Sequence, residues 1–80
     1  MIERTVTIKT SLDARQAAFF VQTAGKYQSD IRIAIDDKKV NAKSIMGTIA
    51  LGITAGQCAN IIADGEDEEA AVNELASVLA

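Results

Sequence analysis

Four stretches of the chain carry the apolar pattern of β-strands. In residues 2–10 and 31–35, apolar and polar side chains alternate, which is the period of a strand with one buried face. A turn-prone pair of aspartates follows the second stretch and leads into a short extended run over residues 39–42, so a hairpin is expected there. Residues 57–63 are mostly apolar and end at a turn signal, which predicts a fourth strand.

Three other stretches repeat apolar residues every three or four positions, as helices with one buried stripe do. The first covers residues 14–27, with Phe19 on the side opposite its stripe. A short helix is expected over residues 44–51, ending at Gly52, where glycine suits a left-handed cap. In the last helix the acidic residues 66–69 form the first turn and offset the positive end of the helix dipole. The residues expected to be buried are Ala17, Phe20, Val21, Ala24 and Tyr27 in the first helix and Ala71, Leu75, Val78 and Leu79 in the last.

The predicted order is β-α-β-β-α-β-α, which places the chain in the α+β class. The simplest arrangement of strands and helices mixed in this way is an open-faced β-sandwich, in which three helices cover one face of a four-stranded, mainly antiparallel sheet. The other face of the sheet is expected to be solvated. A chain of 80 residues buries one modest core, so residues 1–80 are expected to form one domain.

The composition excludes several kinds of catalytic and binding site. The chain contains no histidine, which excludes phosphohistidine transfer, histidine acid–base catalysis and histidine-based metal sites. A net charge of −3 works against direct binding to nucleic acid. The lone Cys58 has no partner for a disulfide or a zinc site and is expected to be a small core residue. No signal peptide or membrane span is evident, so we expect a soluble cytoplasmic protein that holds no metal or cofactor.

The first segment with candidate chemistry covers residues 11–17, where a strand leads into a helix. Asp13 is a preferred N-cap residue, and Gln16 three positions later suits a reciprocal capping arrangement. The alternative is that the Asp13 carboxylate accepts a phosphoryl group that Arg15 helps to hold. Such an acyl phosphate normally needs a divalent cation, and no further carboxylates lie nearby in the sequence to bind one.

The second segment covers residues 41–47. Ser44 is expected to cap the short helix, and the alternative is regulatory phosphorylation, because unpaired N–H groups and a favourable dipole at a helix N-terminus accommodate a phosphate. The helix carries Ile45, Met46, Ile49 and Leu51 on different faces, so one sheet cannot bury them all. The exposed members would form a partner surface, unless the loop that follows the helix covers them.

Taken together, the two segments resemble the HPr family, the small phosphocarrier proteins of the bacterial sugar phosphotransferase system. The most specific match is Lys39-Val40-Asn41-Ala42-Lys43-Ser44-Ile45-Met46-Gly47, and further matches lie at residues 21–24, 51–53 and 61–65. The first segment departs from the carriers, because Asp13 occupies the place of their phosphorylated histidine. Ser11 and Gln16 likewise replace a glycine and a proline, whereas Leu12, Ala14, Arg15 and Ala17 agree with the motif.

The resemblance implies a regulatory protein and no enzyme. The chain looks most like the catabolite repression HPr-like proteins, which lack the active histidine and keep the serine. Ser44 would then be phosphorylated by HPr kinase/phosphorylase, and the protein would act as a corepressor for a LacI-type catabolite control regulator. The docking face implied by the resemblance comprises Ala14, Arg15, Ile45, Met46 and Ile49. Two alternatives stay open, a divergent phosphocarrier that uses Asp13 and an unswitched adaptor that binds another protein or itself as a homodimer.

Overall fold

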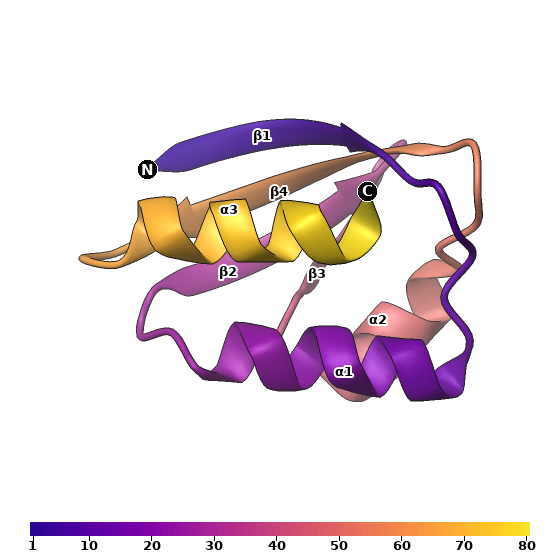
Figure 1. Ribbon diagram of the computed structural model, residues 1–80, viewed down its shortest axis with the longest axis horizontal. Helices are drawn as coiled ribbons and strands as arrows, with labels where there is room; N and C mark the ends of the chain where they lie inside the picture. The colour runs from indigo at the N-terminus through magenta and orange to yellow at the C-terminus, as the bar shows by residue number, and fades with distance from the viewer.

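The computed structural model describes residues 1–80 and shows a four-stranded sheet with the order β1-β4-β2-β3 (Figure 1). The strands are β1 (Ile2–Thr7), β2 (Asp30–Ile35), β3 (Lys38–Asn41) and β4 (Cys58–Asp64). Every neighbouring pair is antiparallel, with β4 between β1 and β2. The predicted order of elements and the antiparallel sheet are confirmed, and the two edges of the sheet are β1 and β3.

Three helices, α1 (Ala14–Gly25), α2 (Ile45–Leu51) and α3 (Glu68–Leu79), cover one face of the sheet (Figure 1). Alternate residues of β2 and β4 point toward these helices, and Phe20 of α1 lies fully buried among them. The core is one cluster of buried apolar residues, whose largest members are Phe20, Ile8, Ile31, Ile33, Ile61, Leu75, Leu79 and Val72. The opposite face of the sheet is left to solvent, as the pattern predicted.

Several boundaries differ from the expectation because contacts distant in the sequence end the elements early. The first strand ends at Thr7 instead of Thr10, because the backbone of Ile8 bonds to the loop before β4 and the N–H of Lys9 donates to the carbonyl of Leu79 at 3.1 Å. Helix α1 ends at Gly25, and Tyr27 lies in the turn beyond it. In α3, Val72 is fully buried and Val78 only partly.

The acidic run at the start of α3 has the predicted role only in part. Only Glu68 and Glu69 lie in the first turn of the helix, and Asp67 precedes it. The Asp67 carboxylate accepts hydrogen bonds from the N–H of Gln28 at 2.8 Å, the N–H of Ser29 at 3.0 Å and the hydroxyl of Ser29. These bonds, first of all the one from the Ser29 hydroxyl, lower the pKa of Asp67. Asp67 therefore joins the start of α3 to the loop before β2.

The prediction for Cys58 is wrong, because its side chain is exposed. The residues of β4 alternate between the two faces of the sheet, and Ala59, Ile61 and Ala63 take the buried positions. Cys58 therefore points to the solvated face. Because this segment is mostly apolar, its sequence does not show which side chains face the core. The pairing of β4 with β1 and β2 settles this alternation of buried and exposed side chains.

Candidate functional site

Asp13 caps helix α1. It has the extended backbone of an N-cap residue, and its Oδ1 accepts a hydrogen bond from the N–H of Gln16 at 2.9 Å. The structure thus confirms the capping role, but only the Asp13 half of the reciprocal arrangement forms. The side chain of Asp13 is exposed, as are those of Ala14 and Arg15 in the first turn of the helix.

The segment before Asp13 is tied to the loop that follows α2. The Ser11 hydroxyl oxygen accepts from the N–H of Ala55 at 2.9 Å, and the N–H of Leu12 donates to the carbonyl of Ile53 at 3.1 Å. These bonds bring the start of α1 beside the end of α2. Sequence reasoning missed this role of Ser11, because its partner lies 44 positions away along the chain.

Ser44 caps helix α2, as predicted. Its backbone is extended, and its Oγ accepts from the N–H of Gly47 at 3.1 Å, while its carbonyl accepts from the N–H of Thr48 at 3.0 Å. Gly47 also keeps the surroundings of the hydroxyl open, since a Cβ at that position would lie 3.3 Å from both the Ser44 Oγ and the Val40 Cβ. Ser44 is half-buried at the N-terminus of the helix.

The apolar surface of α2 is open to solvent. The exposed fractions are 36% for Ile45, 76% for Met46 and 48% for Ile49, whereas Thr48 and Leu51 are buried beneath them. The alternative that the following loop covers these side chains is wrong. That loop turns away at Gly52, whose φ of 68° is the left-handed cap conformation expected for glycine, and it binds to the segment before α1 instead.

The predicted site residues thus lie on two neighbouring helices. Helix α1 packs against α2, with Ala14 and Arg15 close to the C-terminal end of α2. Ser44 lies at the other end of α2, and a helix of seven residues is about 10 Å long. Ser44, Ile45, Met46 and Ile49 therefore lie together on α2 and its cap, whereas Ala14 and Arg15 lie in the first turn of α1, beside the other end of α2.

Lys43 is a neighbour of the site that the sequence reasoning left out. Its Nζ donates to the carbonyl of Tyr27 at 2.7 Å, and its N–H donates to the Asn41 side chain at 2.9 Å. Tyr27 in turn donates its hydroxyl to Glu74 of α3, which raises the pKa of Tyr27 and lowers that of Glu74. The Lys43 ammonium group is therefore bonded to the turn at Tyr27, and α3 contacts the same turn through Glu74.

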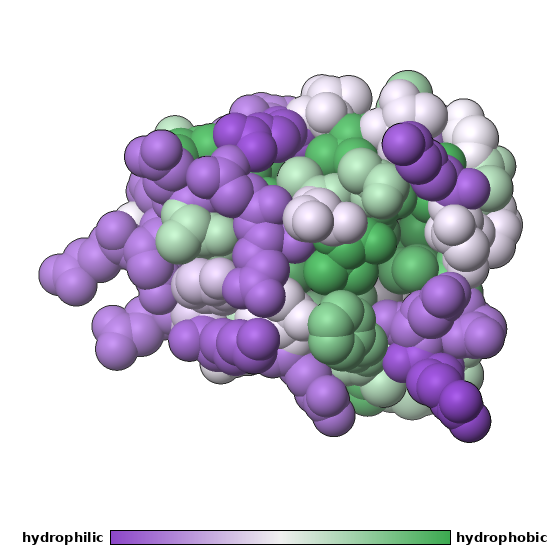
Figure 2. Space-filling model, viewed as in Figure 1, coloured by the Kyte–Doolittle hydropathy of each residue, from purple (hydrophilic) through white to green (hydrophobic).

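Two surface hollows exist, and neither contains Ser44 or Asp13. Figure 2 shows apolar surface over the groove between α1 and the C-terminal part of α3, where one hollow lies. Its lining residues are Thr10, Leu12, Gln16, Phe19 and Val78. Phe19 is 56% exposed there, which confirms its predicted place outside the buried stripe. The other hollow lies on the solvated face of the sheet.

The fold gathers no group of three cysteine or carboxylate side chains that could hold a metal ion. None of its three helices is both long and apolar enough to cross a bilayer. The chemistry the site offers is that of hydroxyl and carboxylate oxygens at helix N-termini beside an exposed apolar surface.

Both the sequence and the structure of the chain are similar to those of known proteins. The family model described as the PTS HPr component phosphorylation site matches residues 2–80. The HPr-like protein Crh of Bacillus subtilis (strain 168) is 50% identical over 72 residues, which cover 90% of this chain and 85% of that protein. The crystal structure of the phosphocarrier protein HPr from Bacillus anthracis superposes with a TM-score of 0.95 at 41% identity, covering 99% of this chain and 96% of the other.

A crystal structure of Bacillus subtilis Crh is also similar, with a TM-score of 0.80 and 49% identity. The match covers 92% of this chain and 85% of the Crh chain. That protein is described as an intertwined dimer with a swapped domain.

Proposed function

Because the chain belongs to the HPr family, we propose that it is a non-catalytic regulatory protein whose partner binding is switched by phosphorylation of Ser44. The observation that carries the proposal is the position of the Ser44 hydroxyl, which caps α2 directly beside the exposed Ile45 and Met46. The similarity to HPr-like proteins, one of which is described as a catabolite repression protein, supports a role in carbon catabolite regulation.

Phosphorylation at this position changes charge without demanding a change of fold. A phosphate adds about −1.5 to −2 charges and acceptor oxygens, which the N–H groups and dipole of a helix N-terminus stabilise. The hydroxyl now accepts one hydrogen bond from Gly47, so the helix is already organised around an oxygen at this point. Phosphorylation would therefore change mainly the charge and the hydrogen-bond acceptors on the surface of α2 that a partner contacts.

The docking face has an apolar centre and a basic edge. Ile45, Met46 and Ile49 expose apolar side chains on α2, and Arg15 adds a positive charge at the start of α1, next to Ala14. Methionine adapts its shape to a partner more readily than branched residues do. A partner that meets this face with apolar residues and an arginine opposite the phosphate would bind the phosphorylated form more tightly. The partners proposed are HPr kinase/phosphorylase and a LacI-type catabolite control regulator.

A histidine phosphocarrier role is not part of the proposal, since the chain has no histidine. At the position of the family's active histidine, the Asp13 carboxylate is engaged in capping α1 through the N–H of Gln16. We propose further that residues 1–80 act as one HPr-like domain in the cytoplasm. The dimer described for crystallised Crh supports a homodimer as an additional state of this protein.

Phosphorylation by HPr kinase/phosphorylase and ATP tests the switch directly. The wild type is expected to gain a single phosphate, measured by intact-protein mass spectrometry, and Ser44→Ala is expected to gain none. Ser77→Ala is the matched control, because Ser77 is an exposed serine on α3 far along the chain from the site. It should be phosphorylated like the wild type. A wild type that gains no phosphate refutes the switch.

Binding of the LacI-type regulator separates the proposal from the two alternatives. The phosphorylated protein is expected to bind more tightly than the unmodified one. Equal binding of both forms, and of Ser44→Ala, would instead identify an unswitched adaptor. A hydroxylamine-labile phosphate acquired from phosphoenolpyruvate and enzyme I of the phosphotransferase system would identify Asp13 as a phosphate carrier and overturn the non-catalytic role.

A further inference from the structure

The turn that presents Ser44 is bonded to itself and to the sheet. The Asn41 carbonyl accepts a hydrogen bond from the N–H of Ser44 at 3.0 Å, and the Asn41 side chain accepts one from the N–H of Lys43 at 2.9 Å. The N–H of the buried Ala42 donates to the carbonyl of Ile31 in β2 at 2.9 Å. These three bonds fix the turn on the side of the sheet, and none of them reaches α1 or α3.

The side chain of Lys43 joins the same turn to the segment that follows α1. Its Nζ donates to the carbonyl of Tyr27 at 2.7 Å, 16 positions away along the chain. Lys43 is half-buried and takes part in none of the ion pairs of the structure. A partly buried ammonium group needs a hydrogen-bond partner, and here that partner is an uncharged backbone oxygen. The Lys43–Tyr27 bond therefore fixes the position of the turn without neutralising the charge of the lysine.

The residue that accepts this bond is itself fixed. The Tyr27 hydroxyl donates to Glu74 of α3, and Lys26 next to it forms a 3.5 Å ion pair with the same carboxylate. Both contacts hold the segment after α1 against α3. Because Lys43 bonds to this segment, the turn at Ser44 is fixed from the side of the helices as well as from the sheet.

Phosphorylation depends on the direction in which the Ser44 hydroxyl points. In the transfer, the Ser44 Oγ forms a bond to the γ-phosphorus of ATP, the bond from that phosphorus to the ADP oxygen breaks, and the hydroxyl proton passes to a base of the kinase. The attacking and leaving oxygens must lie roughly in line, and a displacement of about 1 Å can lower the rate about a hundredfold. The Gly47 N–H, at 3.1 Å, orients the Ser44 Oγ relative to α2. The Lys43–Tyr27 bond orients the turn from which α2 starts.

We propose that Lys43 is a positioning residue for the phosphorylation of Ser44, because its bond to the Tyr27 carbonyl holds the turn in the orientation in which the hydroxyl receives the phosphoryl group. The inference rests on the proposed phosphorylation of Ser44 and adds the residue that orients the serine for it. The apolar surface that a kinase would contact is carried by α2, whose cap is formed by Ser44 and Gly47. Loss of the Lys43–Tyr27 bond is therefore expected to lower the kcat of the kinase for this protein and to change its KM little.

Steady-state kinetics with HPr kinase/phosphorylase and ATP test this role. Lys43→Met has a side chain of similar length but no N–H donor, so kcat is expected to fall about tenfold while KM changes less than about threefold. Lys43→Arg keeps a long side chain with cationic N–H donors and is expected to restore most of kcat. Lys43→Ala removes the bond without adding an apolar group and should behave like Lys43→Met. Circular dichroism checks that each variant is folded.

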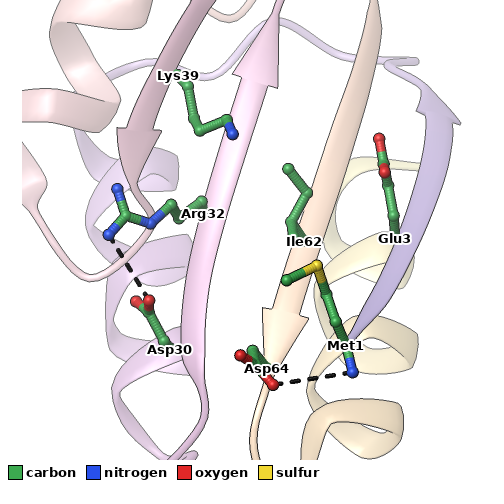
Figure 3. Close-up of a pocket in the computed structure, with 7 residues that line it drawn as sticks. All are labelled: Met1, Glu3, Asp30, Arg32, Lys39, Ile62 and Asp64. Carbon is green, nitrogen blue, oxygen red and sulfur yellow. Dashed lines mark ion pairs between the residues drawn. The ribbon is translucent and has the colours of Figure 1, made fainter.

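Lys39→Met is the matched control, because it makes the same change of charge four positions away. Lys39 lines the hollow on the solvated face of the sheet (Figure 3) and takes part in no ion pair, so this variant should be phosphorylated like the wild type. A wild type that gains no phosphate refutes the proposed switch and the positioning role with it. If the wild type is phosphorylated and Lys43→Met keeps the wild-type kcat, the positioning role alone is refuted. A loss confined to KM, or one shared by Lys39→Met, also refutes it, since it would show a direct kinase contact or a general attraction between charges.

Discussion

Gly65 lies in the turn between β4 and α3, where the chain passes against the loop before β2. A Cβ at this position would lie 2.6 Å from the Oγ, 2.7 Å from the Cα and 2.9 Å from the Cβ of Ser29. Two of these contacts are to atoms that cannot rotate away, since the Cα and Cβ move only with the backbone. Gly65→Ala therefore forces the turn and the Ser29 loop apart.

The loss of folding stability in Gly65→Ala can be placed within a range. Overpacking by a methyl group costs about 1–3 kcal/mol when the surroundings must shift. The upper part of this range is expected here, because moving Ser29 also weakens its bonds to the Asp67 carboxylate. In a domain of this size a loss of 1 kcal/mol lowers the melting temperature by about 4–8 °C, so a fall of roughly 10–20 °C is expected.

Thermal unfolding followed by circular dichroism at neutral pH measures this effect. Gly25→Ala is the matched control, because a Cβ at Gly25 would have nothing within 4 Å and the residue lies in α1. Alanine favours a helix over glycine by up to about 1 kcal/mol, so this variant should melt at or above the wild-type temperature. Equal melting temperatures for the two variants would refute the steric reasoning.

Three further predictions concern charge and docking. The pKa of Asp67 is lowered on folding, so its contribution to stability is present above the ordinary value of 3.8 and lost as the pH falls through the folded value. Urea unfolding should therefore show Asp67→Asn less stable than the wild type at pH 7 and the difference shrinking below about pH 4. Asp13→His removes a fixed negative charge from the position of the family's active histidine and is expected to raise affinity for enzyme I in calorimetry, and equal affinities would contradict this. Met46→Ala should weaken regulator binding in calorimetry by about tenfold while leaving the melting temperature within a few degrees, since 76% of the side chain is exposed, and unchanged binding would remove Met46 from the docking face.

The departures from the carrier motif have a structural consequence that their sequence positions did not reveal. Ser11 stands where the carriers have glycine, and its hydroxyl holds the N–H of Ala55 in the loop after α2. Asp13 stands where they have histidine, and it caps α1. Both side chains therefore make hydrogen bonds that hold the first segment in place.

The sequence by itself determined the order of the elements and the residues that cap α1 and α2. The alternation of Ile31, Ile33 and Ile35 predicted a strand with one buried face, and these three side chains are buried. Asp13 and Ser44 were correctly predicted as helix caps, because a cap bonds to a residue only three positions away. The short helix also predicted that some of its apolar side chains cannot be buried against the sheet, but only the structure showed that the following loop leaves Met46 exposed.

Only the tertiary structure decided how distant segments meet. The strand order β1-β4-β2-β3 places Glu3 beside Ile62, and the same register turns Cys58 out to solvent, against the expectation from composition. Asp67 was predicted to belong to a helix turn and instead binds the Ser29 loop, 38 positions away. Such pairings depend on how the helices pack on the sheet, and no local pattern of residues encodes them. The apolar periodicity of each element predicts which of its faces is buried. Which other element packs against that face depends on the tertiary structure.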